Sequence, residues 1–194
     1  MKAIQSIFSS SLVILVVCMG NLIAQEQVIY QLEPSSQMTI SGTSSLHDWE
    51  STVEQIEGTA TFVMQGTEIE DIKGLVVTIP VKSIKSGKSI MDGKTYKALL
   101  EDKYPNITFS GKGIEKISMG KILVKGILNI AGVEKEVKIP ADYEINKQKL
   151  SVNGTLDLKM TDFNIEPPTA LMGTLKTGDE IKVSFTSELI KEIL

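Results

Sequence analysis

Hydrophobic and polar residues alternate along most of the chain, and the alternation is cleanest in residues 149–161, KLSVNGTLDLKMT. Every second position from Leu150 to Met160 is apolar or glycine, and the positions between them are polar. Successive side chains of a β-strand point to opposite faces, so this pattern predicts a strand with one apolar face that is buried (the dry face) and one polar face that contacts solvent (the wet face). The same alternation recurs through the sequence, which therefore predicts many strands that share one apolar surface.

Strands are predicted over most of the chain beyond its first two dozen residues. They cover residues 28–33, 37–43, 52–65, 69–81, 106–111, 121–130, 133–146, 149–161 and 180–190. The alternation between residues 28 and 81 is less regular than later in the chain, and it does not show which face points inward. Residues 162–178 are predicted to be irregular.

One short helix is predicted over residues 92–103. Tyr96, Leu99 and Leu100 stand at the i, i+3 and i+4 spacing of a helix face. Asp92 is placed to cap the first turn. Because the apolar stripe is narrow, this helix is expected to lie on another part of the fold.

Sequential strands with one dry face predict an all-β fold, either a sandwich or a closed barrel. Several predicted strands are about twice the usual length of 5–6 residues, which favours a single antiparallel, lipocalin-like barrel of about eight strands. Small residues on the dry face are expected to relieve strand bending and to leave volume unfilled. They are Gly58, Ala60, Gly126, Ala141 and Gly154. A barrel of eight strands is just wide enough to hold one slender ligand.

The N-terminus has the pattern of a signal peptide over residues 1–24. Lys2 provides the positive start, residues 12–17 (LVILVV) belong to a short apolar run, and Ala24 is a small residue at the expected cleavage point. The run is shorter than the about 20 residues of a membrane span, although an uncleaved anchor is the alternative. Residues 25–194 are then one exported domain, periplasmic or secreted.

The cysteine content and the charged residues argue against a lipid anchor and a nucleic-acid partner. Cys18 is the only cysteine and follows Val17, where a lipoprotein signal has Gly, Ala or Ser, so a lipid anchor through Cys18 is not expected. Without Lys2, 19 basic residues face 24 acidic ones, a balance that argues against a nucleic-acid partner. The sequence has no arginine, so an anionic group would be held by lysine, hydroxyls or backbone amides.

Five motifs resemble, in their order, those of the YceI-like lipid/polyisoprenoid-binding family. They are SSLHDW (44–49), SIKSGKSIMDGKTYKALL (83–100), KYPNITFSG (103–111), VKGILNIAGVEKEVKIP (124–140) and MTDFNI (160–165). The resemblance implies an exported bacterial protein, often dimeric, with an extended lipocalin-like barrel that holds an isoprenoid or fatty-acyl chain. Thr161 departs from the family pattern, which often has Arg or Lys there, and the departure weakens a role in phosphate recognition.

The first functional hypothesis is an exported binding protein that transports, stores or sequesters a long-chain lipid, such as a quinone, a prenol, a fatty acid or a fatty amide. No other cofactor is expected, and a homodimer and transient membrane contact are further expectations. The helix at 92–103 and the segment 162–178 would cover one end of the barrel. The residues predicted to line the interior and its mouth are Ile40, His47, Trp49, Phe62, Val77, Leu99, Ile107, Phe109, Leu128, Tyr143, Leu156, Leu158, Phe163 and Phe185.

Two other functions fit parts of the sequence. The same barrel could be filled by its own side chains and act through its surface, since each dry-face residue taken singly is also plain core. A hydrolase would have to use His47, the only histidine, but its neighbour Asp48 points to the opposite face of a strand.

One histidine and no cysteine beyond residue 24 do not make a metal site. Lys85, Lys88 and Lys94 form either a solvated face or a weak basic rim for an anionic head group.

Overall fold

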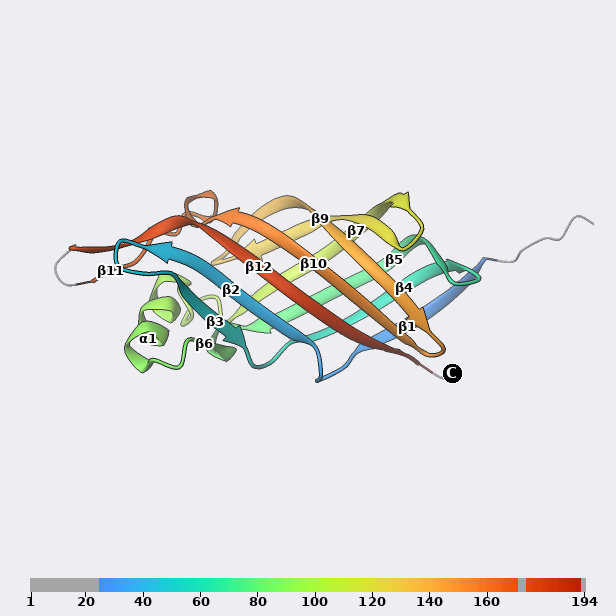
Figure 1. Cartoon of the computed structure of the whole chain (residues 1–194), viewed down its shortest axis with the longest axis horizontal. Coiled ribbons are helices and arrows are strands. Elements are labelled where there is room, and N and C mark those ends of the chain that lie inside the picture. The colour runs from blue at the N-terminus through green and yellow to red at the C-terminus, as the bar shows by residue number, and fades with distance from the viewer. Residues whose placement is uncertain (1–24, 171–173, 193–194) are drawn as a thin grey trace, which may run out of the picture.

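A computed structural model describes residues 25–170 and 174–192 (Figure 1). The predicted signal peptide and Cys18 lie outside these residues. The strands are β1 Glu26–Leu32, β2 Gln37–Ser44, β3 Trp49–Val53, β4 Glu57–Gln65, β5 Glu68–Pro80, β6 Ile84–Lys85, β7 Asn106–Ser118, β8 Lys121–Ile130, β9 Val133–Asn146, β10 Lys149–Lys159, β11 Thr169–Ala170 and β12 Leu175–Lys191. The helical segments are η1 Val81–Ser83, α1 Ser89–Ala98 and η2 Met160–Phe163.

The strands close into one antiparallel barrel with eight strands around its circumference. The order is β1-β4-β5-β7-β8-β9-β10-β12, and β12 pairs back onto β1 through Leu32 and Leu189. The long strands cross the axis of the molecule diagonally, and α1 lies beside one end of the barrel (Figure 1). The predicted lipocalin-like barrel with one short helix is therefore confirmed.

Three walls of the barrel are each built from two strands. β1 and β2 both run antiparallel to β12, one after the other along its length. The next wall consists of β4, which pairs with β1, and β3, which pairs with β2. The third wall consists of β5, which pairs with β4, and β6, which pairs with β3. The strand predicted over residues 52–65 is therefore wrong as one unit, because residues 54–56 separate β3 from β4.

Two buried serines restore hydrogen bonding where these walls are interrupted. The Ser36 hydroxyl accepts from the Glu188 N–H at 3.0 Å and donates to the Glu188 carbonyl oxygen at 3.2 Å. The Ser83 hydroxyl lies 3.0 Å from the Gln55 carbonyl oxygen and 2.7 Å from that of Pro80. Each serine thus replaces ladder hydrogen bonds that the interrupted backbone cannot make.

We expect Ser36→Ala to destabilise the barrel by about 1–3 kcal/mol, because it removes the hydrogen-bond partner of the Glu188 N–H, whereas the Glu188 carbonyl oxygen keeps the N–H of Glu33. Urea unfolding followed by Trp49 fluorescence measures the loss. Ser35→Ala is the matched control, since Ser35 is the exposed neighbouring serine. Equal unfolding midpoints for the two variants would contradict the role given to the Ser36 hydroxyl.

Two β-bulges explain why the early strands do not alternate cleanly. The pairing of β4 with β5 shifts between Thr61 and Phe62 and again between Val63 and Met64. As a result the inward residues of β5 follow one another at a spacing of three, as Ile69, Ile72 and Leu75. A bulge adds one residue to one strand, so the period of two fails at each of these points.

The helix differs from its predicted bounds. α1 spans Ser89–Ala98, so it begins three residues before 92 and ends five before 103. Leu100 adopts a left-handed backbone with φ of 52° beyond the helix end and is exposed, so it does not belong to the apolar stripe. Tyr96 and Leu99 do pack against the core.

Asp92 is not the cap that the sequence predicts. Its carboxylate accepts hydrogen bonds from the Ser86 N–H at 2.8 Å and the Ser86 hydroxyl at 2.6 Å. These two bonds hold the pKa of Asp92 below its ordinary value. The side chain therefore ties the loop before α1 to the helix instead of capping the first turn.

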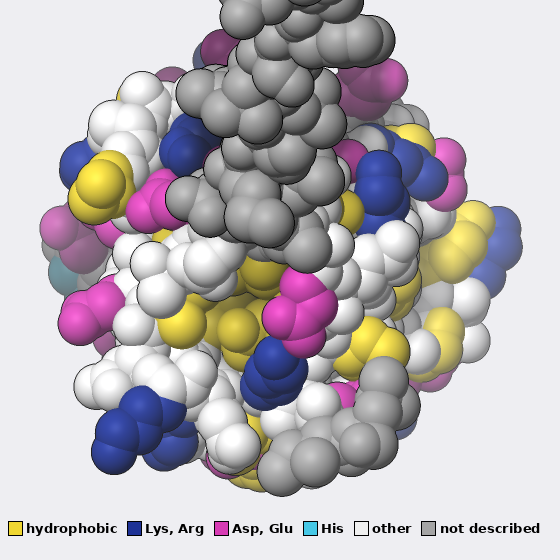
Figure 2. All heavy atoms as spheres, turned by 90° about the vertical axis from the view of Figure 1, so that its right-hand side faces the viewer, with side chains coloured by type: hydrophobic (Ala, Val, Ile, Leu, Met, Phe, Trp, Pro, Cys, Tyr) yellow, Lys and Arg dark blue, Asp and Glu magenta, His cyan; other side chains and the backbone are white. Residues whose placement is uncertain are grey.

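Several of the most deeply buried side chains lie in the half of the barrel away from α1. Ile69, Ile122 and Leu150 are almost fully buried there, with relative exposures of 0%, 2% and 0%. Figure 2 looks onto this end, where charged side chains surround a hydrophobic centre. No helix in the described ranges is long and apolar enough to cross a membrane.

Candidate ligand-binding site

The interior of the barrel holds a cavity of about 760 Å³. Its position can be followed along the inward face of β10. Leu150 is fully buried, whereas Leu156 and Leu158, farther toward α1 on the same face, are only half-buried. On the paired strand β12, Leu189 is buried and Val183 is half-buried. The inward side chains are thus more accessible toward α1, although the lining of the cavity also includes Ile69, Ile122 and Leu189 in the other half.

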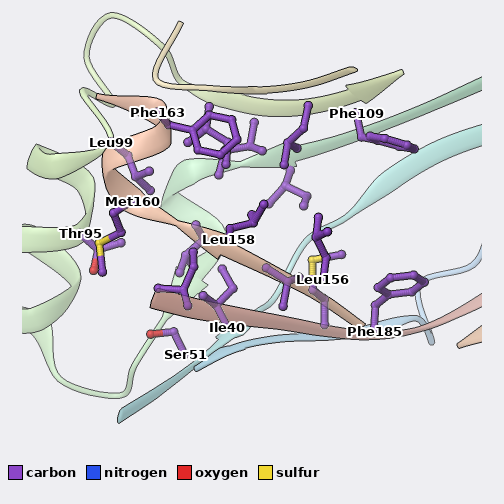
Figure 3. A pocket seen from close by; sticks show the side chains of 18 of the residues that line it. Ile40, Ser51, Thr95, Leu99, Phe109, Leu156, Leu158, Met160, Phe163 and Phe185 are labelled. Atoms are coloured by element: carbon purple, nitrogen blue, oxygen red, sulfur yellow. The ribbon is translucent and has the colours of Figure 1, made fainter. Parts of the chain in front are cut away.

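Two phenylalanine rings lie on opposite walls of this cavity. Phe109 comes from β7 and Phe185 from β12, four positions apart in the ring of eight strands (Figure 3). A Cβ atom built on Gly126 would lie 2.5 Å from the Phe109 ring, and one on Gly154 would lie 2.5 Å from the Phe185 ring. The two glycines therefore let the rings lie against the wall.

This arrangement corrects the expectation that dry-face glycines leave empty volume. The spaces over Gly126 and Gly154 are occupied by aromatic rings. The open volume lies instead between half-buried aliphatic side chains nearer α1, such as Leu156, Leu158 and Ile181.

The α1 end of the cavity is covered by the helix and by η2. Thr95 from α1, Leu99 directly after α1, and Met160 and Phe163 from η2 line it (Figure 3). Phe163 is 2% exposed, so η2 is packed into the barrel end. The cover expected from the predicted helix and the segment 162–178 is thus present among the described residues, although that segment also contains the end of η2, β11 and the start of β12.

The structure brings together all of the predicted site residues except Tyr143. The residues that line the cavity are Ile40, His47, Trp49, Phe62, Val77, Leu99, Ile107, Phe109, Leu128, Leu156, Leu158, Phe163 and Phe185. Their placement does not test contact with a ligand, which stays a prediction. Cavity-lining residues that the sequence interpretation missed include Ser51 and Thr95. Ser51 stands midway between Trp49 and Val53, so the alternation of β3 could have identified it.

Tyr143 has a different role from the predicted one. Its hydroxyl donates to the Glu68 carboxylate at 3.0 Å and accepts from the Ile69 N–H at 3.2 Å. Burial is the main cause that raises the pKa of Tyr143 above its ordinary value. The side chain belongs to the packed half of the barrel, away from the open volume.

The SSLHDW loop is held by its own backbone. The Ser44 hydroxyl donates to the His47 carbonyl oxygen at 2.7 Å and accepts from the N–H groups of Leu46 and His47. The His47 ring is exposed, and its Nδ1 lies 2.7 Å from the carbonyl oxygen of Asp48. The Trp49 indole N–H donates to the Thr43 carbonyl oxygen at 3.0 Å.

These contacts shape the rim of the cavity without forming a nucleophile–base pair. In the described part of the chain the Ser44 hydroxyl is engaged with backbone groups, and the His47 ring makes no hydrogen bond to it. No three His, Cys, Asp or Glu side chains gather as a metal site would require, within the same residues.

The closed antiparallel barrel with an apolar internal cavity defines the class of lipocalin-like binding folds. The YceI-like domain matches this chain over residues 30–189. The chain belongs to the YceI-like family. No curated protein matches it by sequence.

Solved structures share the fold at low sequence identity. BcnA of Burkholderia cenocepacia superposes with a TM-score of 0.67 and 19% identity, covering 79% of this chain and 95% of that one. The Campylobacter jejuni YceI protein gives 0.62 and 24%, covering 74% and 85%. A polyisoprenoid binding domain from Saccharophagus degradans, implicated in plant cell wall breakdown, gives 0.64 and 13%, covering 84% and 98%. At these identities the likeness shows a common fold.

Proposed function

We propose that this protein binds one long-chain lipid, an isoprenoid or a fatty-acyl chain, inside the barrel and carries or sequesters it. The observation that carries the proposal is the cavity of about 760 Å³, whose inward aliphatic residues on β10 and β12 are only half-buried by the protein itself. A volume of this size lies within the range of 300–1,000 Å³ that is typical of ligand pockets. The YceI-like family and the polyisoprenoid binding domain with the same fold support the choice of ligand class.

The energetics suit an apolar chain. Each buried methylene group contributes about 0.8 kcal/mol, so a tail of a dozen methylenes would gain roughly 10 kcal/mol before the cost of ordering it. The tail would cover the half-buried side chains of Leu156, Leu158 and Val183. An open apolar interior also argues against the alternative of a barrel packed by its own side chains.

A non-enzymatic role accords with the site. The cavity is lined almost wholly by aliphatic and aromatic side chains, and the hydroxyl of Ser44 is held by backbone groups. The family is also one of binding domains, which supports a carrier over a hydrolase.

Native mass spectrometry tests the proposal. Protein spanning residues 25–194 is delipidated and incubated with a mixture of a long-chain prenol, a quinone and a fatty acid. We expect a single adduct at a ratio of one lipid per barrel, because the cavity is one continuous volume. A mass that stays at the apo value with every lipid would overturn the proposal and favour the packed interaction barrel.

Export, membrane contact and dimerisation are further parts of the proposal. Export rests on the apolar run within residues 1–24, and mass determination of the protein from the periplasm or medium would show cleavage after Ala24. Transient membrane contact would give a water-insoluble ligand a route to the cavity. Dimerisation rests on the family resemblance, and sedimentation of the purified protein tests it.

A further inference from the structure

The charged side chains that line the cavity lie at one end only. Four lysines line it, Lys88 and Lys94 beside or on α1, Lys159 at the end of β10 and Lys176 near the start of β12. All of them lie at the α1 end, and His47 joins them there. Among the described residues that line the cavity there is no Asp or Glu.

The lysines at this mouth are largely without acidic partners. Within the described ranges Lys88 and Lys176 form no ion pair, and Lys94 donates to the Thr169 carbonyl oxygen. Lys159 lies 3.9 Å from Glu180, at the limit of an ion pair.

Two nearby carboxylates are already engaged. Asp92 accepts two hydrogen bonds from Ser86, and Asp179 accepts from the Thr161 N–H at 2.9 Å and the Thr161 hydroxyl at 2.7 Å. The charged residues that line the mouth are all lysines, whereas Asp92 and Asp179 lie near them outside the lining and stay ionised, since their hydrogen bonds lower their pKa.

The Ser51 hydroxyl is a further polar group at this end of the cavity. Ser51 is 4% exposed and lines the cavity, yet its hydroxyl makes no hydrogen bond to any described residue. Figure 3 shows its oxygen turned toward the side of the cavity where α1 lies. The described residues contain no fully buried side-chain oxygen that lacks a partner, so the Ser51 oxygen is accessible from the cavity and can donate to a polar group of a ligand.

The beginning of α1 adds backbone donors. Ser89, Ile90 and Met91, the first residues of this ten-residue helix, line the mouth, and no side chain caps them. The N–H groups of a first helical turn carry partial positive charge and favour an anion. Lysines, an unpartnered hydroxyl and uncapped amides therefore converge on one end of an otherwise apolar cavity.

We infer that the ligand is a single-chain lipid with an anionic head group, a carboxylate or a phosphate monoester, which enters tail first and leaves its head at the α1 mouth. The inference rests on the proposed function and narrows its ligand class. The far half of the barrel accepts only the tail, because the charged residues that line the cavity all lie at the α1 end. In the absence of arginine, the lysines act as point charges instead of a bidentate fork.

Matched ligands separate head-group recognition from tail binding. We compare palmitic acid, hexadecyl phosphate and methyl palmitate by isothermal titration calorimetry with delipidated protein at pH 8. The acid and the phosphate are expected to bind at least tenfold more tightly than the neutral ester, since all three share one hydrocarbon chain. The ratio between acid and phosphate shows which anion the mouth prefers.

A charge-removal variant completes the test. The triple variant Lys88→Gln, Lys94→Gln and Lys176→Gln is expected to lose about tenfold in affinity for the two anions and to bind the ester unchanged. Retained ester binding shows that the variant is folded. The control variant Lys112→Gln, Lys138→Gln and Lys149→Gln removes the same charge from exposed positions that do not line the cavity, and it is expected to keep the preference for anions.

The outcomes distinguish this inference from the proposed function. If the neutral ester binds as tightly as the acid, or both triple variants lose anion affinity equally, the inference fails while lipid binding stands. If none of the three ligands binds and the prenol and quinone also fail, the proposed function itself is overturned.

Discussion

Leu156→Trp is expected to reduce lipid affinity at least tenfold while leaving the barrel folded. Leu156 points into the open half of the interior and is half-buried, so an indole ring there would occupy volume that the lipid tail needs (Figure 3). Enlarging a side chain in a packed core costs about 1–3 kcal/mol. Because this side chain borders empty space, we expect the unfolding free energy to change by less than about 1 kcal/mol.

For each variant we measure the lipid affinity by calorimetry and the stability as the midpoint of urea unfolding. Thr155→Trp is the control, since Thr155 is the next residue of β10 and faces outward. It is expected to bind lipid as the parent protein does. Unchanged affinity in Leu156→Trp would show that the lipid does not occupy the open half of the barrel.

The second large effect is on stability. Leu150→Ala is expected to destabilise the protein by about 3–5 kcal/mol, since Leu150 is fully buried among tightly packed neighbours. Leu156→Ala, the same substitution six residues along the same face of β10, is expected to cost less than half as much in the lipid-free protein. Its side chain already borders the cavity, so fewer contacts are lost.

Adding lipid should narrow the difference in cost between the two substitutions. Bound lipid stabilises the folded state by mass action. Its contacts with the Leu156 side chain would make Leu156→Ala more costly, whereas the cost of Leu150→Ala would stay constant. Equal costs for the two variants in lipid-free protein would indicate that the interior is packed throughout.

Much of the barrel could be predicted from the sequence where its strands are regular. β8 and β10 keep a strict period of two, so the inward positions of Leu128, Leu156 and Leu158 were visible directly. The inward positions of the strands between residues 28 and 81 were harder to predict from the sequence. Bulges in the pairing of β4 with β5 change the spacing of inward residues from two to three, which breaks the alternation of a regular strand.

Two features depend on contacts between distant parts of the chain: the points where a barrel wall passes from one strand to another, and the hydrogen bonds of the residues near the site. Ser36 contacts Glu188 across 152 positions, which a local pattern cannot reveal. Tyr143 has the right alternation for a cavity residue but lies at the packed end, where its hydroxyl contacts Glu68 and Ile69. Which residues face open space, and which face one another, follows only from closure of the barrel.

The long last strand has a consequence for how the protein reaches its native state. β12 pairs with β10 on one side and with both β1 and β2 on the other, so the barrel is joined through its final residues. A chain emerging from the ribosome or from an export channel cannot close the barrel until β12 is available. Pairings of such large sequence separation are slow to form, so a partly emerged chain stays an open sheet for longer than a helical protein would. The edges of that sheet, at β1 and β10, are then exposed to chaperones and proteases until β12 joins them.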